Sequence, residues 1–345
     1  MRSPVRSKGA PVTAYTLEDV AARAGVSRAT VSRVVNDSPR VSDAARRAVE
    51  AAVAEMGYAP NRAARSLAGR RSETIALVVS EPSVRLFADP FFAGTTLGVT
   101  SELAPTPYQL VLMMIQDDAD RARVEAHLLR AGPDGVLLLS SRAGDPLARR
   151  LADAGIPTVV AGHPPPDAAV GYVDADNTGG ARSAVEHLVA GGRWVIATVA
   201  GPADMAPGLD RRAGWADALA AAGRPATDDL VAEADFTREG GARATRALLR
   251  RRPDIDALFV ASDIMALGAL DALRAAGRQV PAQVAVVGFD DSELARSADP
   301  PLTTVRQPIA QLGREMAAGL LAQLDEGADP VGLVLRTELV VRRSA

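Results

Sequence analysis

The stretch Thr16–Asn36 constrains the fold of this chain more than any other. Two short helical patterns meet at Gly25, with Thr16 a favourable N-cap for the first and Ser27 for the second. Gly25 ends the first helix because glycine adopts positive φ at little cost. The inward-facing apolar residues of the second helix are Val31, Val34 and Val35. Its small and basic residues face outward, so the stretch predicts a helix-turn-helix whose second helix enters the DNA major groove.

A helical hairpin without a ligand has the same local pattern, so the following residues matter. A third helix is predicted from Val41-Ser42-Asp43, with Val49, Val53 and Met56 inward. The segment from Gly57 to Arg71 is then basic, and Leu67 is the single large apolar residue of its short helical pattern. Such a helix is marginal alone, which favours a segment that orders against a partner.

The run from Thr16 to Arg71 resembles the DNA-binding headpiece and hinge of the lactose/galactose-repressor (LacI/GalR) family. The matching motifs are Thr-Leu-x-Asp-Val-Ala-x-x-Ala-Gly-Val-Ser-x-x-Thr-Val-Ser-Arg-Val-Val-Asn, Gly-Tyr-x-Pro-Asn and Arg-Ser-Leu-Ala-Gly. The resemblance implies a homodimer that reads two half-sites of a palindromic double-stranded DNA operator. It also implies hinge helices that fold in the minor groove, where Leu67 wedges between base pairs and kinks the DNA.

The resemblance and the predicted helices together imply the DNA contacts. Arg28, Ala29 and Arg33 are expected to read base edges, with Arg28 the best candidate for bidentate recognition of guanine. Five others are expected to touch phosphates and set the register: Thr16, Ser27, Thr30, Ser32 and Asn61. The full predicted set is Thr16, Leu17, Ser27, Arg28, Ala29, Thr30, Ser32, Arg33, Asn36, Tyr58, Asn61, Ala64 and Leu67.

The distribution of charge agrees with a DNA-binding head on a different body. Residues 1–71 contain 13 Arg and Lys against 6 Asp and Glu, whereas residues 72–345 contain 26 against 36. The chain has no cysteine, which excludes disulfides, thiol catalysis and cysteine-based zinc sites. Residues 1–14 are a flexible lead-in by this interpretation, and the absence of an apolar stretch there or of a membrane span favours a cytoplasmic protein.

From Glu73 onward the pattern predicts alternating strands and helices, which is typical of parallel sheets. Predicted strands are 74–80, 109–115, 135–139, 157–161, 171–174, 195–200, 229–232, 257–261, 284–288, 303–306 and 333–341. One helix is predicted to begin near Phe91, and residues 81–90 before it are predicted as a loop. Seven further helices are predicted over 118–131, 146–154, 177–190, 211–222, 240–251, 265–276 and 308–324. We therefore expect two α/β subdomains, about 73–173 and 174–302, to which parts of 303–345 return. The predicted domains are a headpiece (15–60), a hinge helix and linker (61–72), and a periplasmic-binding-protein-like core (73–345).

Ligands of open α/β sheets bind beyond the carboxyl ends of the strands, and two facing sheets form a hinged cleft. Polar and aromatic residues that fall at such positions suit a sugar, whose hydroxyls take paired hydrogen bonds and whose ring stacks on an aromatic. The predicted effector residues are Asp89, Phe91, Phe92, His163, Arg211, Phe236, Ser262, Asp263, Asp290 and Gln307. Other interpretations stay open: the two phenylalanines suit a hydrophobic core equally well, either Asp263 or Asp290 could cap a helix, and His163 could be an ordinary loop residue.

The family resemblance extends over this region. Asp89-Pro-Phe-Phe, Arg211-x-x-Gly-Trp, Asp263-x-Met-Ala-Leu-Gly, Val287-Gly-Phe-Asp-Asp and Pro301-Leu-Thr-Thr-Val-Arg-Gln resemble its effector-cleft motifs. Two positions depart from the pattern: Ser262 stands where many members have Asn, and Phe236 where some place a stacking Trp. The loop before Phe92 looks most like the cellobiose- and β-glucoside-type repressors. No leucine-heptad tail follows Val341, so a dimer is expected.

We therefore interpret the chain as a transcriptional repressor that a small sugar, such as a β-glucoside disaccharide, releases from its operator. A regulator of this fold that uses a nucleobase or phosphosugar as co-repressor is the alternative, and a sugar-binding transport protein is a more distant one. Catalysis is not expected, and neither is a cofactor. The three histidines (His127, His163 and His187) are far apart and have no metal-ligand spacing, so no metal site is predicted.

Overall fold

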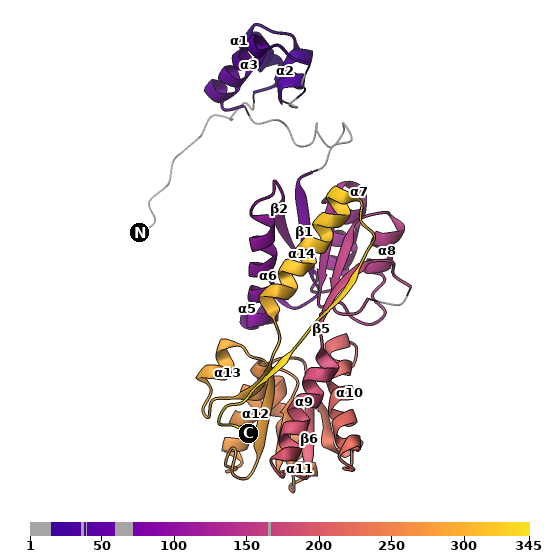
Figure 1. Ribbon diagram of the computed structural model, residues 1–345, viewed down its shortest axis with the longest axis vertical. Helices are drawn as coiled ribbons and strands as arrows, with labels where there is room; N and C mark the ends of the chain where they lie inside the picture. Colours follow the sequence, from indigo (N-terminus) through magenta and orange to yellow (C-terminus); the bar gives the residue numbers. More distant parts are fainter. Residues whose placement is uncertain (1–14, 36–37, 39, 59–71, 165–166) are drawn as a thin grey trace, which may run out of the picture. The chain divides into compact units, whose positions relative to one another are not determined.

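The computed structural model describes residues 15–35, 38, 40–58, 72–164 and 167–345. The chain divides into two compact units, Met1–Ser72 and Glu73–Ala345 (Figure 1). The predicted hinge helix, with Asn61, Ala64 and Leu67, lies outside the described residues, as does Asn36. Among the described residues, no helix has the length and apolarity needed to cross a membrane.

The first unit contains the three predicted helices, α1 (Leu17–Ala24), α2 (Arg28–Val35) and α3 (Asp43–Met56). Thr16 caps α1 as predicted, and its side chain and that of Asp19 form a reciprocal capping box. Gly25 ends α1 at φ 67°, in the left-handed region. The predicted inward residues Val31, Val34 and Val49 are buried together with Val20, Ala21, Ala52 and Tyr58.

The second unit is built on two six-stranded sheets. In spatial order the first sheet contains β11 (Gly332–Leu335), β5 (Gly171–Ala175), β4 (Thr158–Ala161), β3 (Gly135–Leu139), β1 (Thr74–Val79) and β2 (Gln109–Met114). The second contains β12 (Glu338–Val340), β10 (Thr303–Arg306), β9 (Ala285–Asp290), β8 (Ala257–Val260), β6 (Ile196–Ala200) and β7 (Val231–Glu233). Neighbouring strands are parallel except β10 and β12, which confirms the predicted parallel architecture.

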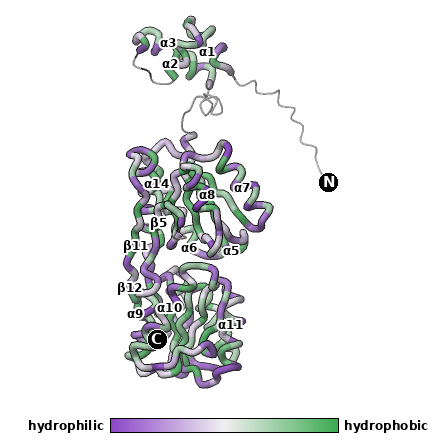
Figure 2. Tube along the Cα trace, turned by 90° about the vertical axis from the view of Figure 1, so that its right-hand side faces the viewer, coloured by the Kyte–Doolittle hydropathy of each residue, from purple (hydrophilic) through white to green (hydrophobic). Residues whose placement is uncertain are grey.

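Helices cover both sheets, and each sheet with its helices is called a half below. The first half carries α5 (Ser83–Ala88), α6 (Pro90–Leu103), α7 (Asp118–Ala131), α8 (Leu147–Asp153) and α14 (Ile309–Glu326). The second half carries α9 (Asn177–Ala190), α10 (Ala206–Ala221), the 3-10 turn η1 (Asp228–Leu230), α11 (Arg238–Arg251), α12 (Asp263–Ala275) and α13 (Glu293–Ser297). Hydrophobic residues gather inside each half, with hydrophilic residues towards the outside (Figure 2).

Helices α6 and α14 pack closely because glycines stand where they meet. A Cβ at Gly98 would lie 2.0 Å from the carbonyl oxygen of Ala310, and one at Gly313 would lie 2.1 Å from that of Thr95. Both distances are far below any real Cβ contact, so only glycine fits at these two positions. The close approach holds α14, which lies near the end of the chain, against α6, which begins directly after the predicted effector residue Asp89.

The C-terminal segment joins both halves, as the sequence predicted, but not as one strand. The predicted strand over residues 333–341 is wrong: β11 pairs in parallel with β5 of the first sheet, and β12 pairs antiparallel with β10 of the second. The break at residues 336–337 lets one extended segment serve two sheets, and the yellow strand in Figure 1 runs along both. Alternating hydropathy is the same in either sheet, so the pattern could not reveal the change.

Three other predictions need correction. The segment 81–90 is not a loop, because α5 occupies most of it. Helix α10 begins at Ala206, five residues before the predicted start, since Pro207 lies in its first turn, where proline is tolerated. The short helix α13 was not predicted; its five residues are too few for a helical period to show.

Candidate ligand pocket and nucleic-acid interface

A pocket with about 750 Å³ of empty space lies between the two halves of the second unit, beyond the carboxyl ends of their strands. It is lined by Arg85, Asp89, Phe91, Ser140, Ser141, Ala161, Gly162, His163, Asp174, Asn177, Met205, Ala206, Pro207, Arg211, Phe236, Ser262, Asp290, Gln307 and Leu312. Eight of the ten predicted effector residues are among them. The structure places the other two, Phe92 and Asp263, behind the pocket wall.

Arg211 is the central cation of the pocket. It lies inside α10, not at the first position of the helix as predicted, and it is buried. Its Nε donates to Asn177 Oδ1 at 2.8 Å and its Nη1 to the Ala261 carbonyl at 2.6 Å. The guanidinium carbon lies 3.7 Å from the centre of the Phe289 ring, which supports it from one face. These contacts fix the direction in which the guanidinium can bind a ligand.

Asp290 faces Arg211 at the end of β9. Its Oδ1 accepts a hydrogen bond from Gln307 Nε2 at 2.6 Å and lies 3.6 Å from Arg211 Nη1. Burial raises the pKa of Asp290 well above its ordinary value, and the positive charge of Arg211 opposes that shift. The neighbouring Asp291 points elsewhere, since it pairs with Arg306 at 2.7 Å and with Arg342. The two adjacent carboxylates therefore do not form a paired-acid site.

Asp89 combines a helix cap with a place in the pocket. Its Oδ1 accepts from the Phe91 backbone N–H at 3.0 Å at the start of α6, and burial raises its pKa. The following two phenylalanines separate: Phe91 is half-buried in the lining, whereas Phe92 is buried in the core of the first half. Phe92 therefore meets Phe91 edge-on, with 5.4 Å between ring centres, and supports the pocket from behind.

Arg85 lines the pocket but is not among the predicted effector residues, because the sequence predicts a loop over its segment. It stands four residues after Glu81, with which it forms a buried ion pair at helical spacing. Its guanidinium carbon lies 4.8 Å from the centre of the Phe236 ring and 5.5 Å from that of Phe92. Since Phe236 belongs to the second half, this stacking crosses the pocket. Glu81 lies before α5, and the six residues of this helix are too few for a helical period to show in the sequence.

Ser262 and Asp263 begin α12 but have different tasks. Ser262 lines the pocket and caps the helix, accepting from the Met265 N–H at 3.3 Å. Asp263 lies beneath, where it accepts from Thr304 Oγ1 at 2.6 Å and from Ser292 N and Oγ at 2.8 and 3.0 Å. Burial raises its pKa to about 7. Asp263 thus ties α12 to the segments that follow β9 and form β10, rather than facing a ligand.

Backbone strain gathers at this pocket. Non-glycine residues with positive φ are uncommon, and three of the lining residues adopt it: Ser140 at 59°, Phe236 at 56° and Asp290 at 119°. Such conformations cost of order 1–3 kcal/mol each and persist where the surroundings enforce them, commonly at ligand sites. Strain at three of its residues is consistent with a pocket built for a ligand.

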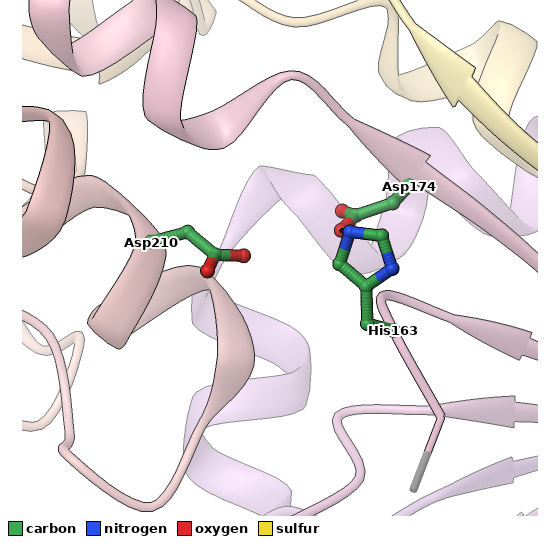
Figure 3. A group of neighbouring side chains, drawn as sticks. All are labelled: His163, Asp174 and Asp210. Atoms are coloured by element: carbon green, nitrogen blue, oxygen red, sulfur yellow. Dashed lines mark ion pairs between the residues drawn. The ribbon is translucent and has the colours of Figure 1, made fainter. Parts of the chain in front are cut away.

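His163 lies at the rim beside two carboxylates (Figure 3). Its Nε2 lies 3.3 Å from Asp174 Oδ2, and Asp210 of α10 faces the pair from the second half. Burial raises the pKa of both Asp174 and Asp210. Asp174 and Asn177, which donates from Nδ2 to Asp174 Oδ1 at 2.9 Å, were not predicted. The available signal was their place at the end of the predicted strand 171–174 and shortly after it.

Besides the Arg85–Phe236 stacking, a second contact joins the two halves, between residues that do not line the pocket. Arg142 Nη1 donates to both carboxylate oxygens of Asp204, at 2.9 and 2.7 Å. The Ala143 N–H also donates to the Asp204 carbonyl at 2.7 Å. Together with the Arg85–Phe236 stacking, this contact holds the two halves against each other around the pocket.

The predicted DNA face is formed by α2 and the start of α1. Ser27, Arg28, Ala29 and Arg33 are exposed, and Thr30 and Ser32 are half-buried. Ser27 Oγ accepts from the Thr30 N–H at 3.1 Å, which caps α2 as predicted. Arg28 forms an exposed ion pair with Glu18, Nε to Oε1 at 2.9 Å. Its guanidinium therefore lies at the surface, where a base edge could replace the carboxylate.

Two predicted DNA contacts lie partly or wholly in the core of this unit. Leu17 is half-buried against it, and Tyr58 is only 8% exposed. Tyr58 packs there because the chain turns at Gly57, at φ 60°, and brings it back under α3. The ring of Tyr58 thus stabilises the three helices. The sequence predicted a DNA contact for this residue and did not predict its place in the core.

Comparison with known proteins gives two matching families. Residues 16–61 match the bacterial regulatory proteins of the lacI family, and residues 185–345 match the periplasmic binding protein-like domain. The transcriptional regulator CelR of Thermobifida fusca is 51% identical over 332 residues, 95% of this chain and 98% of CelR. The repressor CytR of Escherichia coli K12 is 34% identical over 337 residues, 96% of each chain.

Two solved structures cover nearly the whole chain. A complex of CelR with cellobiose has a TM-score of 0.78 and 48% identity, and covers 96% of this chain and all of its own. The lac repressor dimer bound to its operator and the anti-inducer ONPF has a TM-score of 0.83 and 31% identity, and covers 96% of this chain and 98% of its own.

Proposed function

The chain belongs to the lacI family of bacterial transcriptional regulators, and from this premise we propose that it is a repressor released from a palindromic operator by a neutral β-glucoside such as cellobiose. The pocket carries the proposal. Fixed donors and acceptors around Arg211 share the lining with the aromatic ring of Phe91, a combination that suits sugar hydroxyls and a sugar ring.

The charges of the pocket favour a neutral ligand over a phosphosugar. Arg85 is paired with Glu81, and Arg211 faces Asp290. Two further carboxyl groups, Asp89 and Asp174, are in the lining. A phosphate would meet these carboxyl groups without an unpaired guanidinium from either arginine, and burying a charge without a partner is costly. Sugar hydroxyls can instead donate to the same carboxylate oxygens.

Similarity to the CelR–cellobiose complex supports the same ligand class. The segment before Phe92, whose sequence resembles that of β-glucoside-type repressors, forms α5 and contributes Arg85 to the pocket. We propose Asp89, Phe91, Arg211, Phe236, Asp290 and Gln307 as the main sugar contacts, with His163 and Ser262 at the edges.

Dimerisation is proposed through the first half. Leu97 of α6 and Val111 and Leu112 of β2 are large apolar residues left exposed, and β2 is an edge strand. The lac repressor structure with which the chain aligns is a dimer on its operator. We propose that the same arrangement places two headpieces (15–60) and two hinge segments (61–72), including Leu67, on the operator, and that sugar binding to the core (73–345) withdraws them. Because the operator lies in the cytoplasm, so does the protein; it binds its sugar without turnover and without a cofactor.

Fluorescence anisotropy on a labelled palindrome from upstream of its own gene tests the proposal. We expect cellobiose to release the DNA, and glucose 6-phosphate, adenine and cytidine to leave the complex unchanged. Arg211→Lys should raise the cellobiose concentration needed for release at least about tenfold, since lysine cannot make the paired contacts. Arg212→Lys, on the adjacent exposed arginine, is the matched control. Tighter DNA binding on addition of a nucleobase or phosphosugar would establish the co-repressor alternative instead.

A further inference from the structure

The cluster at the rim of the pocket contains three groups of a kind that bind metal ions. His163 follows β4, Asp174 lies in β5, and Asp210 lies in α10 of the opposite half (Figure 3). Sequence spacing predicted no metal site, because these residues are separated by 11 and 36 positions. The fold nevertheless brings one ligand atom of each within 4.8 Å of the others.

The distances are close to those of a coordinated ion. His163 Nε2 and Asp174 Oδ2 are 3.3 Å apart. Zinc lies about 2.0–2.2 Å from nitrogen and oxygen ligands, so two ligand atoms of one ion are at most about 4.3 Å apart. The limit of 4.8 Å exceeds this by about half an ångström. Asp210 is half-buried, so rotation of its side chain can close that difference.

A second observation points to a missing cation: Asp174 has a buried oxygen without a hydrogen bond. Asp174 is only 5% exposed, and its Oδ1 accepts from Ala175 N at 2.8 Å and from Asn177 Nδ2 at 2.9 Å. Its Oδ2 is directed at the cluster and accepts no hydrogen bond from any described residue, His163 included. Leaving a buried carboxylate oxygen unsatisfied is costly, and a metal ion would satisfy it.

Other charged groups at the site do not fulfil that role. The positive charge of Arg211 opposes the rise in pKa that burial causes at both carboxylates, but its guanidinium is committed to Asn177, Ala261 and Asp290. The imidazole of His163 is half exposed and packs against Tyr172, with 5.0 Å between ring centres. One nitrogen and two carboxylate oxygens remain, a donor set that suits first-row divalent ions.

We propose that His163, Asp174 and Asp210 bind one divalent transition-metal ion, such as Zn²⁺, at the rim of the pocket. Three protein ligands leave at least one coordination position for water or a sugar hydroxyl. Since Asp210 comes from the second half, the ion joins the two halves across the pocket. The metal site does not depend on the proposed sugar response, whereas any effect of the ion on that response does.

Titration of the untagged full chain with Co²⁺, after removal of metals with a chelator, tests the site. We expect visible d–d absorption to saturate at one ion per chain, and Zn²⁺ to displace the Co²⁺. His163→Gln and Asp210→Asn should each weaken binding at least about tenfold, as loss of supporting residues at metal sites already does. His127→Gln is the matched control, because His127 is exposed on α7 and is not a member of the cluster.

Absence of a saturable Co²⁺ band would overturn the proposal, and so would equal binding by the parent and His163→Gln. Binding lost in His163→Gln but retained in Asp210→Asn would overturn the joining of the two halves. Circular dichroism confirms that each variant is folded. If Co²⁺ binds as described and no sugar releases DNA, the proposed function fails alone; if cellobiose releases DNA and no Co²⁺ binds, the metal site fails alone.

Discussion

The two units place an arginine–carboxylate pair in opposite surroundings. Arg28 and Glu18 of the DNA-binding unit are 2.9 Å apart with side chains 69% and 59% exposed. Arg211 and Asp290 of the pocket are 3.6 Å apart with side chains 6% and 10% exposed. Water screens the first pair, so it can open at small cost when DNA arrives. The second is desolvated and held by further hydrogen bonds, so losing one partner leaves a buried polar group alone.

Arg211→Ala should therefore have the greatest effect on stability. It leaves Asp290 and Asn177 buried without their partner, and removing one member of a buried pair costs roughly 3–5 kcal/mol. Urea unfolding of the full chain, followed by circular dichroism, measures the loss. Arg212→Ala is the control, because that exposed guanidinium pairs with Asp228 at 3.1 Å and should cost under about 0.5 kcal/mol. An equal loss of unfolding free energy in the two variants would mean that burial of Arg211 does not make its pair more important for stability than that of Arg212.

Asp263 should make the stability of the second unit depend on pH. Burial raises its pKa from 3.8 to about 7, so between these values the folded chain holds a proton that the unfolded chain has released. Its contribution is most favourable at low pH and falls as pH rises through this window. One pKa unit corresponds to about 1.4 kcal/mol, so the change amounts to a few kcal/mol.

Urea unfolding at about pH 5 and about pH 8 measures this dependence. Asp263→Asn keeps one acceptor oxygen for Ser292 and should reduce the fall in stability between the two conditions; the part due to other buried carboxyls such as Asp290 should remain. Asp271→Asn, which changes an exposed carboxyl of the same helix, should keep the parent's fall. If the stability of Asp263→Asn depends on pH as that of the parent does, a group other than Asp263 causes the dependence.

The capping box of the DNA-binding unit should show the opposite dependence on a smaller scale. Hydrogen bonds from Thr16 lower the pKa of Asp19, so its contribution is present above the ordinary value near 3.8 and is lost as pH falls through the lowered pKa. Thr16→Ala removes the two hydrogen bonds of the Thr16 hydroxyl with Asp19, keeps the one from its backbone N–H, and should destabilise α1 by about 1 kcal/mol. Hydrogen exchange of the α1 amides measures this, and Thr16→Ser, which keeps the hydroxyl, should leave protection unchanged.

Glu18→Gln should change stability least and DNA affinity instead. Exposed pairs contribute about 0.2–1 kcal/mol, so freeing Arg28 and removing a negative charge near the phosphates should tighten operator binding by up to about fivefold. Anisotropy at two salt concentrations measures the change. Glu55→Gln, which removes the exposed partner of Arg23, is the control. Unchanged affinity in Glu18→Gln would argue against Arg28 as a reader of bases.

Local patterns predicted much of this fold. The bounds of α7, α9, β3 and β10 agree with the sequence predictions residue for residue, because apolar periodicity and capping residues act within a few positions. The helix-turn-helix likewise follows from Thr16, Gly25 and Ser27, each of which acts on its own helix end. Eight of the ten predicted effector residues line one pocket, because the strands of a parallel sheet end at the same edge.

Packing between distant segments decided the rest. Adjacent residues such as Phe91 and Phe92 separate into pocket and core only once α6 lies against the rest of the first half. Arg85 contacts Phe236, which is more than a hundred positions away in the sequence. Asp210 lies near His163 and Asp174, which are tens of positions away. One C-terminal segment divides between two sheets. Spacing along a chain specifies which face of an element a residue occupies, whereas the partner of that face depends on burial and hydrogen bonds formed between elements that meet only in the folded protein.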